Sequence, residues 1–220
     1  MLENEEKREY FTVKHDGDDT WKNVILLGSK LDTECDINRR KGLASAAWYK
    51  NIKLLTSKSL PLLLRVQYFQ AFISSIFLYQ CGTWTLPQYL NHKIDVFQRD
   101  FLRRIIGIKS HKGKNISNDA LYKITQQKPW SETCRYRRLT LFGHTCRLPE
   151  GAPSKETLNE CLKPYKRLVG GQKTTLLGTI IEDFSLENIP ISEAQQIAQN
   201  KKEYQKLVNR LVSRKKESQQ

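Results

Sequence analysis

The sequence predicts a mainly α-helical protein with a β-hairpin at its N-terminus. From residue 36 onwards, apolar residues recur every three or four positions, which is typical of amphipathic helices. Before that point, two short β-like runs, 10–13 and 21–27, flank a polar cluster that contains the favourable turn pair Asp16 and Gly17. The 220 residues are enough for one large domain or two small ones.

Three strong helices are predicted in the first half of the chain. The first covers residues 36–55. The second is expected to be capped by Ser59, to enter through Pro61 and to run towards Tyr79. Its second half is apolar nearly all round, which predicts burial. The third covers residues 87–106 and should end at Gly107.

In the second half of the chain, the sequence predicts several shorter helices and one long helix. Ser117 or Asn118 can cap a short helix. Residues 130–148 form a further amphipathic segment that Pro149 should end, and the change in composition there is the clearest boundary. Short helical segments near 158–162 and 174–184 precede a final helix expected over residues 192–216.

The charge balance favours an anionic partner. The chain has 37 lysines and arginines against 23 acidic residues, a net charge of +14. Nucleic acid is the first expectation and a membrane surface the second, while the alternative is a basic surface that only keeps the protein soluble. The residues expected to bind nucleic acid lie in four groups: Arg39, Arg40 and Lys41; Arg99, Arg103 and Arg104; Lys109, Lys112 and Lys114; and Arg135, Arg137 and Arg138.

Three aromatic residues lie among these cations. Tyr122, Trp130 and Tyr136 could stack on unpaired bases. The alternative is ordinary core packing, which is favoured for Trp130. For any single cation, a solvated helix face explains the sequence equally well.

The sequence gives little support for catalysis or for a metal site. A cluster of aspartates at 16, 18 and 19 could bind Mg²⁺, but it falls in a polar turn and is better explained as a solvated loop. Cys134, His144, Cys146 and Cys161 could supply zinc ligands, but their spacing is irregular. We therefore expect no catalytic residue, no metal and no cofactor in this chain.

The cysteines and the start of the chain predict an intracellular protein. Five cysteines without CxxC pairs suit reduced thiols better than a disulfide framework. The acidic start is unlike a signal peptide, and no apolar run is long enough for a transmembrane helix. The expected location is the nucleus or the cytoplasm.

An ordered series of motifs resembles the reverse transcriptases of non-LTR (LINE-type) retrotransposons. The resemblance covers roughly residues 22–212. The segments that carry it are 26–31 (LLGSKL), 37–40 (INRR) with 44–47 (ASAA), 72–79 (FISSIFLY), 83–86 (TWTL), 97–99 (FQR), 102–108 (LRRIIGI), 116–118 (ISN), 137–139 (RRL), 142–144 (FGH), 147–149 (RLP) and 170–175 (GGQKTT). The chain departs from the family at Gln80, Gly82, Leu176 and Tyr204, where glycine, glutamate and two tryptophans are usual.

The resemblance implies a fragment that follows the catalytic palm of such a polymerase. Residues 1–33 would resemble the end of the palm, with Leu27, Gly28 and Ser29 as a primer-grip-like segment. Residues 34–108 would form a thumb-like helical bundle, and residues 109–220 a helical C-terminal extension. The paired aspartates that hold Mg²⁺ in the family would lie before residue 1.

The resemblance therefore implies a nucleic-acid-binding fragment of an RNA-directed DNA polymerase that lacks its own catalytic aspartates. Its expected partners are RNA, DNA or an RNA–DNA hybrid, together with a separate polymerase palm. An active polymerase would need three metal-binding carboxylates that the sequence does not place. A helical protein-interaction module and a non-functional retroelement relic are the remaining alternatives.

Overall fold

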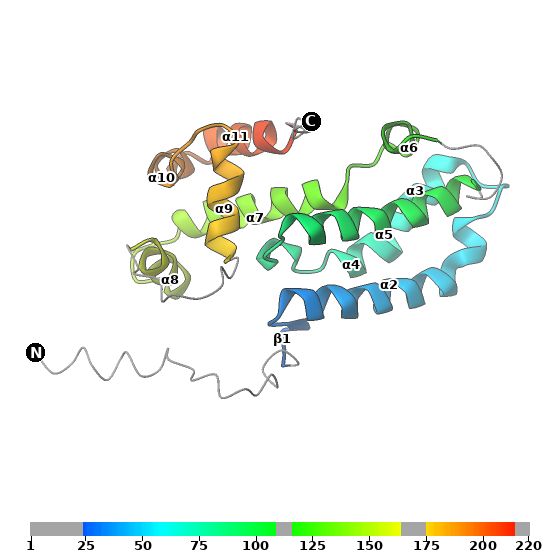
Figure 1. The fold of residues 1–220 in the computed structure, drawn as a ribbon, viewed down its shortest axis with the longest axis horizontal. Coiled ribbons are helices and arrows are strands. Elements are labelled where there is room, and N and C mark those ends of the chain that lie inside the picture. The colour runs from blue at the N-terminus through cyan, green and yellow to red at the C-terminus, as the bar shows by residue number, and fades with distance from the viewer. Residues whose placement is uncertain (1–23, 109–115, 164–174, 214–220) are drawn as a thin grey trace, which may run out of the picture.

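The fold is mainly helical and begins with a two-stranded antiparallel hairpin, as the sequence predicts (Figure 1). The computed structural model describes residues 24–108, 116–163 and 175–213. In chain order, the elements are β1 (Ile25–Leu26), β2 (Ser29–Lys30), α2 (Thr33–Leu55), α3 (Leu62–Phe69), the π-helix η2 (Gln70–Ser74), α4 (Ser75–Phe77), the 3₁₀-helix η3 (Cys81–Thr83), α5 (Gln88–Ile106), α6 (Asn118–Thr125), α7 (Trp130–Cys146), α8 (Pro153–Leu162), α9 (Leu176–Ser185), α10 (Ile191–Gln199) and α11 (Lys201–Ser213).

Of the two predicted runs, 21–27 contributes to the described hairpin, because β1 lies within it and β2 follows it. Strand β1 pairs with β2, and the turn between them is formed by Leu27 and Gly28. Both turn residues have a positive φ, 47° and 81°, which two-residue hairpin turns favour because it matches the twist of the strands. The expected strand 10–13 and the turn pair at 16–17 lie outside the described residues. Residues 29–30 therefore form the second strand of the hairpin, whereas the sequence predicts only the end of a strand at this point.

Two predicted helix starts need correction. Helix α2 begins earlier than expected, because the Asp32 carboxylate accepts a hydrogen bond from the backbone N–H of Cys35 at 2.8 Å. Ser59 does not cap α3, which begins after Pro61 without a side-chain cap. The Ser59 hydroxyl instead lies 2.7 Å from that of Ser57. The expected single helix towards Tyr79 is interrupted by the π-helical turn η2.

A first core joins α2, the α3–η2–α4 segment, α5, α6 and the beginning of α7. Its centre is a group of packed rings in which Trp130 stacks on Phe77, with ring centroids 4.3 Å apart, and on Phe69 at 5.9 Å. Trp130 is 1% exposed, so of its two predicted roles the structure supports core packing. Trp48 closes the other side of this group against Phe101.

A second core lies among the end of α7, α9, α10 and α11. It includes Leu139, Phe142 and Cys146 of α7, which pack with buried residues of α9, α10 and α11. The residues of α7 up to Cys134 belong to the first core. Helix α7 is therefore shared, and it runs between the two groups of helices in Figure 1.

The predicted final helix is two helices. Helix α10 ends at Gln199, and Asn200 has an extended conformation. The Asn200 side chain accepts a hydrogen bond from the backbone N–H of Lys202 at 3.1 Å. It thereby satisfies one of the N–H groups that have no partner within the first turn of α11. The break lets α10 and α11 both pack on α7. No helix within the described ranges is long and apolar enough to cross a bilayer.

Candidate nucleic-acid interface

Arg39 and Arg40 hold the hairpin onto α2. Both donate to the backbone carbonyl of Gly28, Arg39 at 3.0 Å. Arg40 is 6% exposed, also donates to the carbonyl of Ile76 at 3.4 Å, and lies over the ring of Tyr79 at 4.5 Å. These contacts occupy the Arg40 guanidinium, which therefore has few N–H groups left to bind a ligand.

Asp36 completes this attachment of the primer-grip-like segment. Its buried carboxylate accepts from the Ser29 hydroxyl at 2.7 Å, from the Lys30 backbone N–H at 3.0 Å and from the Trp84 indole at 3.0 Å. It also lies 3.7 Å from the Arg40 guanidinium. The segment around Gly28 is therefore fixed to α2 and to residue 84 by buried polar contacts.

Two predicted cations on α7 are paired inside the protein. Arg138 donates to one carboxylate oxygen of Asp183 at 2.5 and 3.0 Å, and Arg135 donates to the other at 3.0 Å. Arg138 is 3% exposed and Asp183 is 5% exposed. This arrangement ties α9 to α7 through one carboxylate that accepts from both arginines.

Arg137 and Lys41 are also engaged within the molecule. Arg137 donates to the carbonyl of Leu78 at 2.6 Å and lies 3.7 Å from the Cys81 thiol. Lys41 is half-buried, with its ammonium 5.6 Å from the centre of the Phe97 ring. Burial, and after it the nearby charge of Lys93, lowers the pKa of Lys41.

Of the three predicted arginines of α5, Arg99 and Arg103 contact α6. Arg103 donates to the side chain of Asn118 at 2.7 Å, while the exposed Arg104 pairs with Asp100, one turn away, at 2.8 Å. Arg99 lies against Tyr122, whose pKa is raised to about 12 chiefly by burial. Exposed ion pairs of this kind contribute little energy, so Arg104 is free to exchange its partner for a phosphate.

Two further lysines extend this surface. Lys123 and Lys128 are exposed, one on α6 and one just after it. The backbone carbonyl of Lys128 accepts from the side chain of Gln98 of α5 at 2.9 Å, so this part of the chain packs against α5. We call the set Arg99, Arg103, Arg104, Lys123 and Lys128 the α5–α6 cationic face. The predicted loop lysines Lys109, Lys112 and Lys114 fall outside the described residues.

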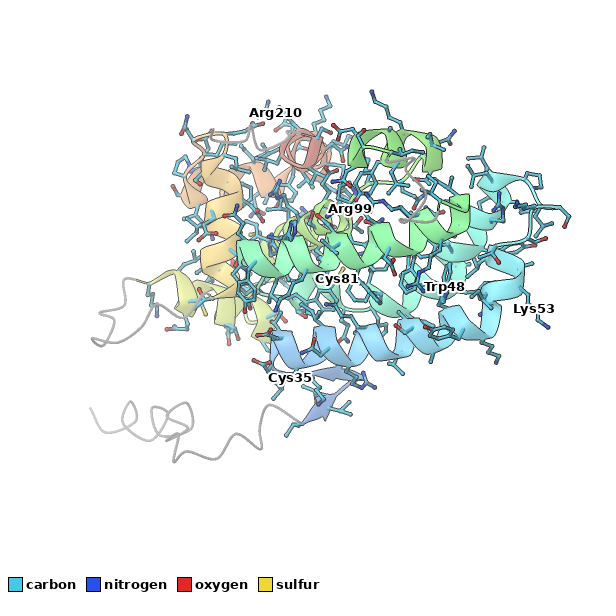
Figure 2. All side chains as sticks on the ribbon, turned by 45° about the vertical axis from the view of Figure 1, so that its right-hand side comes forward. Cys35, Trp48, Lys53, Cys81, Arg99 and Arg210 are labelled. Carbon is cyan, nitrogen blue, oxygen red and sulfur yellow. The ribbon has the colours of Figure 1, made fainter. Side chains whose placement is uncertain are left out.

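A second row of cations follows α11. Lys202, Lys206 and Arg210 are exposed and spaced by four residues, so they share one face of the helix. Arg210 pairs with Glu187 at 2.6 Å. In Figure 2 it lies at the outer edge of the C-terminal helices, whereas Arg99, on α5, lies near the middle of the molecule. The sequence-based set leaves this row out, although the four-residue spacing is visible in the sequence.

Of the three aromatic candidates, Tyr136 is the most open to solvent. It is 37% exposed and lines a groove of about 450 Å³ between α7 and α11, together with Lys128 and Asn209. Its hydroxyl accepts from the side chain of Gln205 at 3.2 Å. Tyr122 is half-buried, and its hydroxyl donates to Gln98 at 3.4 Å.

The described part of the chain contains no metal centre. Within it, no group of three or more histidine, cysteine, aspartate or glutamate side chains is placed to hold a metal ion. Cys134 and Cys146, two of the residues considered as zinc ligands, belong to different cores. The aspartates at 16, 18 and 19 lie outside the described residues.

Comparisons of the chain with protein-family models, with curated proteins and with solved structures found no match.

Proposed function

We propose that this protein binds the sugar–phosphate backbone of a nucleic acid through the α5–α6 cationic face. The observation that carries the proposal is that Arg103 contacts Asn118 at the start of α6 and Arg104 pairs with Asp100, while Lys123 and Lys128 are exposed on α6 and just after it. Asn118 and Asp100 are exposed groups, unlike the buried carboxylates near Arg40 and Arg138. Phosphate contacts by such a face release counterions and need no particular base sequence.

The resemblance of the motif series to non-LTR reverse transcriptases suggests which kind of nucleic acid the protein binds. In that family, the region after the palm holds the template–primer duplex or the element RNA. We therefore propose that the preferred ligand is an RNA–DNA hybrid or RNA, and that the chain binds it without polymerising. The described residues contain no group of carboxylates for the metal ions of a polymerase.

Salt-dependent binding tests the proposal. The full chain is titrated into a fluorescently labelled RNA–DNA hybrid, RNA or DNA duplex at several salt concentrations. Replacing Arg104 and Lys123 by alanine should weaken binding and reduce the slope of log K against log salt by about 0.9 for each lost phosphate contact. The change should be similar for all sequences of one duplex type.

A matched control removes the same charge elsewhere. Lys50 and Lys53 are exposed near the end of α2 and do not belong to the proposed face. Replacing both by alanine also lowers the net charge by two but should leave the slope nearly unchanged. Equal losses in the two double variants would show general attraction without an interface, and absence of binding at low salt would reject the function.

The hairpin favours a second candidate, contact with another protein chain. Val24, Ile25, Leu26, Leu27 and Leu31 are 49%, 53%, 60%, 79% and 54% exposed, an apolar group that a folded protein usually covers. A separate polymerase palm is the partner that the resemblance implies. Replacing Ile25 and Leu27 by lysine should abolish such binding and leave nucleic-acid binding intact. Equal binding of a palm to both forms would exclude this role.

A further inference from the structure

Cys81 and Cys134 bring two thiols together from distant parts of the chain. Cys81 begins η3 and Cys134 lies in the second turn of α7; both are 0% exposed. Each thiol shifts the pKa of the other, and both residues belong to the first core. Figure 2 labels Cys81 in the interior of the molecule.

The backbones around this pair are also in contact. A Cβ atom on Gly82, the neighbour of Cys81, would lie 3.3 Å from the backbone carbonyl of Arg137. Arg137 is three residues after Cys134, so the two lie on the same side of α7. Glycine at position 82 thus permits η3 to approach α7 closely, within one helical turn of Cys134.

The surroundings make Cys81 the better nucleophile of the two. The neighbouring Cys134 thiol lowers the pKa of Cys81 against the opposing effect of burial, and the Arg137 guanidinium, 3.7 Å from the sulfur, also lowers it. The pKa of Cys134 is raised, chiefly by burial. Cys81 is thus the thiol that more readily loses its proton and becomes a nucleophile, and Cys134 is the thiol that stays protonated.

We propose that Cys81 and Cys134 are a redox-active pair that forms a reversible disulfide between η3 and α7. With hydrogen peroxide as the oxidant, the Cys81 thiolate attacks one peroxide oxygen, the O–O bond breaks, and a sulfenic acid and hydroxide form. The Cys134 sulfur then attacks the sulfenic sulfur, and a proton and hydroxide leave as water. The balance is two thiols and one peroxide giving one disulfide and two waters.

The chain provides its own comparison thiols. Cys146 is also buried on α7, but burial raises its pKa to about 11, and no second thiol perturbs it. Cys161 is exposed on α8. An exposed thiol without a resolving partner should be oxidised by the same peroxide to the sulfenic or sulfinic acid and should not enter an internal disulfide.

The bond would close a long loop through the first core. Residues 81 and 134 are far apart in sequence, and closing a loop of this size stabilises a protein mainly by restricting the unfolded chain. The thermal midpoint of the oxidised protein should rise by about 10 °C. Because α7 is shared by both cores, oxidation would also fix the position of η3 against the helix that joins them.

Mass spectrometry of the native full chain tests the proposal. The protein is exposed to stoichiometric hydrogen peroxide, remaining thiols are alkylated, and the chain is digested with trypsin. Cys81 and Cys134 then lie in separate peptides, 66–93 and 124–135. A single cross-linked product of these two peptides, lighter by two hydrogens than their sum and reversed by a reductant, is expected. The variant Cys146→Ser should give the same product, and Cys134→Ser should not.

The wild-type protein alone can overturn the proposal, so the test does not depend on the variants folding. If Cys161 is oxidised in the same sample while residues 81 and 134 are both alkylated, the pair is not redox-active. A cross-link that forms only in denaturant would also refute it. Neither result bears on nucleic-acid binding, which is measured separately.

Discussion

Asp183→Asn should destabilise the protein strongly, because it removes the carboxylate that faces two buried arginines. Arg138 donates two hydrogen bonds to this carboxylate, and Arg135 donates a third. The side chains of Arg138 and Asp183 are 3% and 7% exposed, so water cannot replace the lost charge. The asparagine amide would point an N–H donor at a guanidinium that also only donates. Removing one partner of such a buried pair costs about 3–5 kcal/mol.

Urea unfolding followed by circular dichroism measures this cost. With a denaturant dependence of about 2–3 kcal/mol per molar, the midpoint should fall by about 1–2 M. Asp100→Asn is the matched control, since it removes the same charge from the exposed pair with Arg104, whose side chains are 47% and 53% exposed. It should cost about 0.5 kcal/mol or less. Equal midpoints for the two variants would refute the reasoning that burial makes the difference.

Three further predictions concern packing, a buried carboxylate and alkaline pH. Gly143→Ala should lower the free energy of unfolding by about 1–3 kcal/mol, because the new Cβ would lie 2.1 Å from the buried ring of Tyr204. In the control Gly42→Ala, the new Cβ meets nothing within 4 Å, and the change should stabilise α2 by about 0.5–1 kcal/mol. Asp36→Asn should cost about 3 kcal/mol and speed amide hydrogen exchange in β2, whereas unchanged exchange would contradict its role in holding the hairpin. Burial raises the pKa of Tyr122 from 10.0 to about 12, so the unfolded chain loses this proton first, and its contribution to stability should be complete below pH 10.0 and lost towards pH 12. A tyrosine-to-phenylalanine change there should remove this part of the alkaline decrease, and an unaltered pH profile would contradict the assignment.

Local signals in the sequence place several helices well. Gly107 ends α5 with φ of 87°, as expected of a glycine after the last turn. Ser117 caps α6 by accepting from the Ala120 N–H, as predicted. The apolar spacing of residues 87–106 also identifies the buried face of α5, including Ile94 and Phe101. These features depend on residues within one or two turns of each other, so the sequence contains what is needed.

Other features depend on partners that are distant in sequence. The expected nucleic-acid-binding set includes Arg138, but that residue pairs with Asp183, 45 positions away. The break at Asn200 follows from packing two helices on α7, where the apolar pattern alone reads as one continuous helix. The segment that carries Lys123 and Lys128 lies against α5 only because α6 folds back on that helix. No local pattern contains these pairings.

The helical class of this protein, most helix positions and the strong positive charge follow from local patterns in the sequence. Periodicity, caps and composition are local or additive properties, so they can be read without knowledge of the fold. Which cations are free to meet a ligand depends on the tertiary structure. A buried arginine must be paired, and its partner is set by which helices pack together. That choice separates Arg40 and Arg138, which hold the fold together, from the exposed Arg104, and it brings Cys81 and Cys134 into one core.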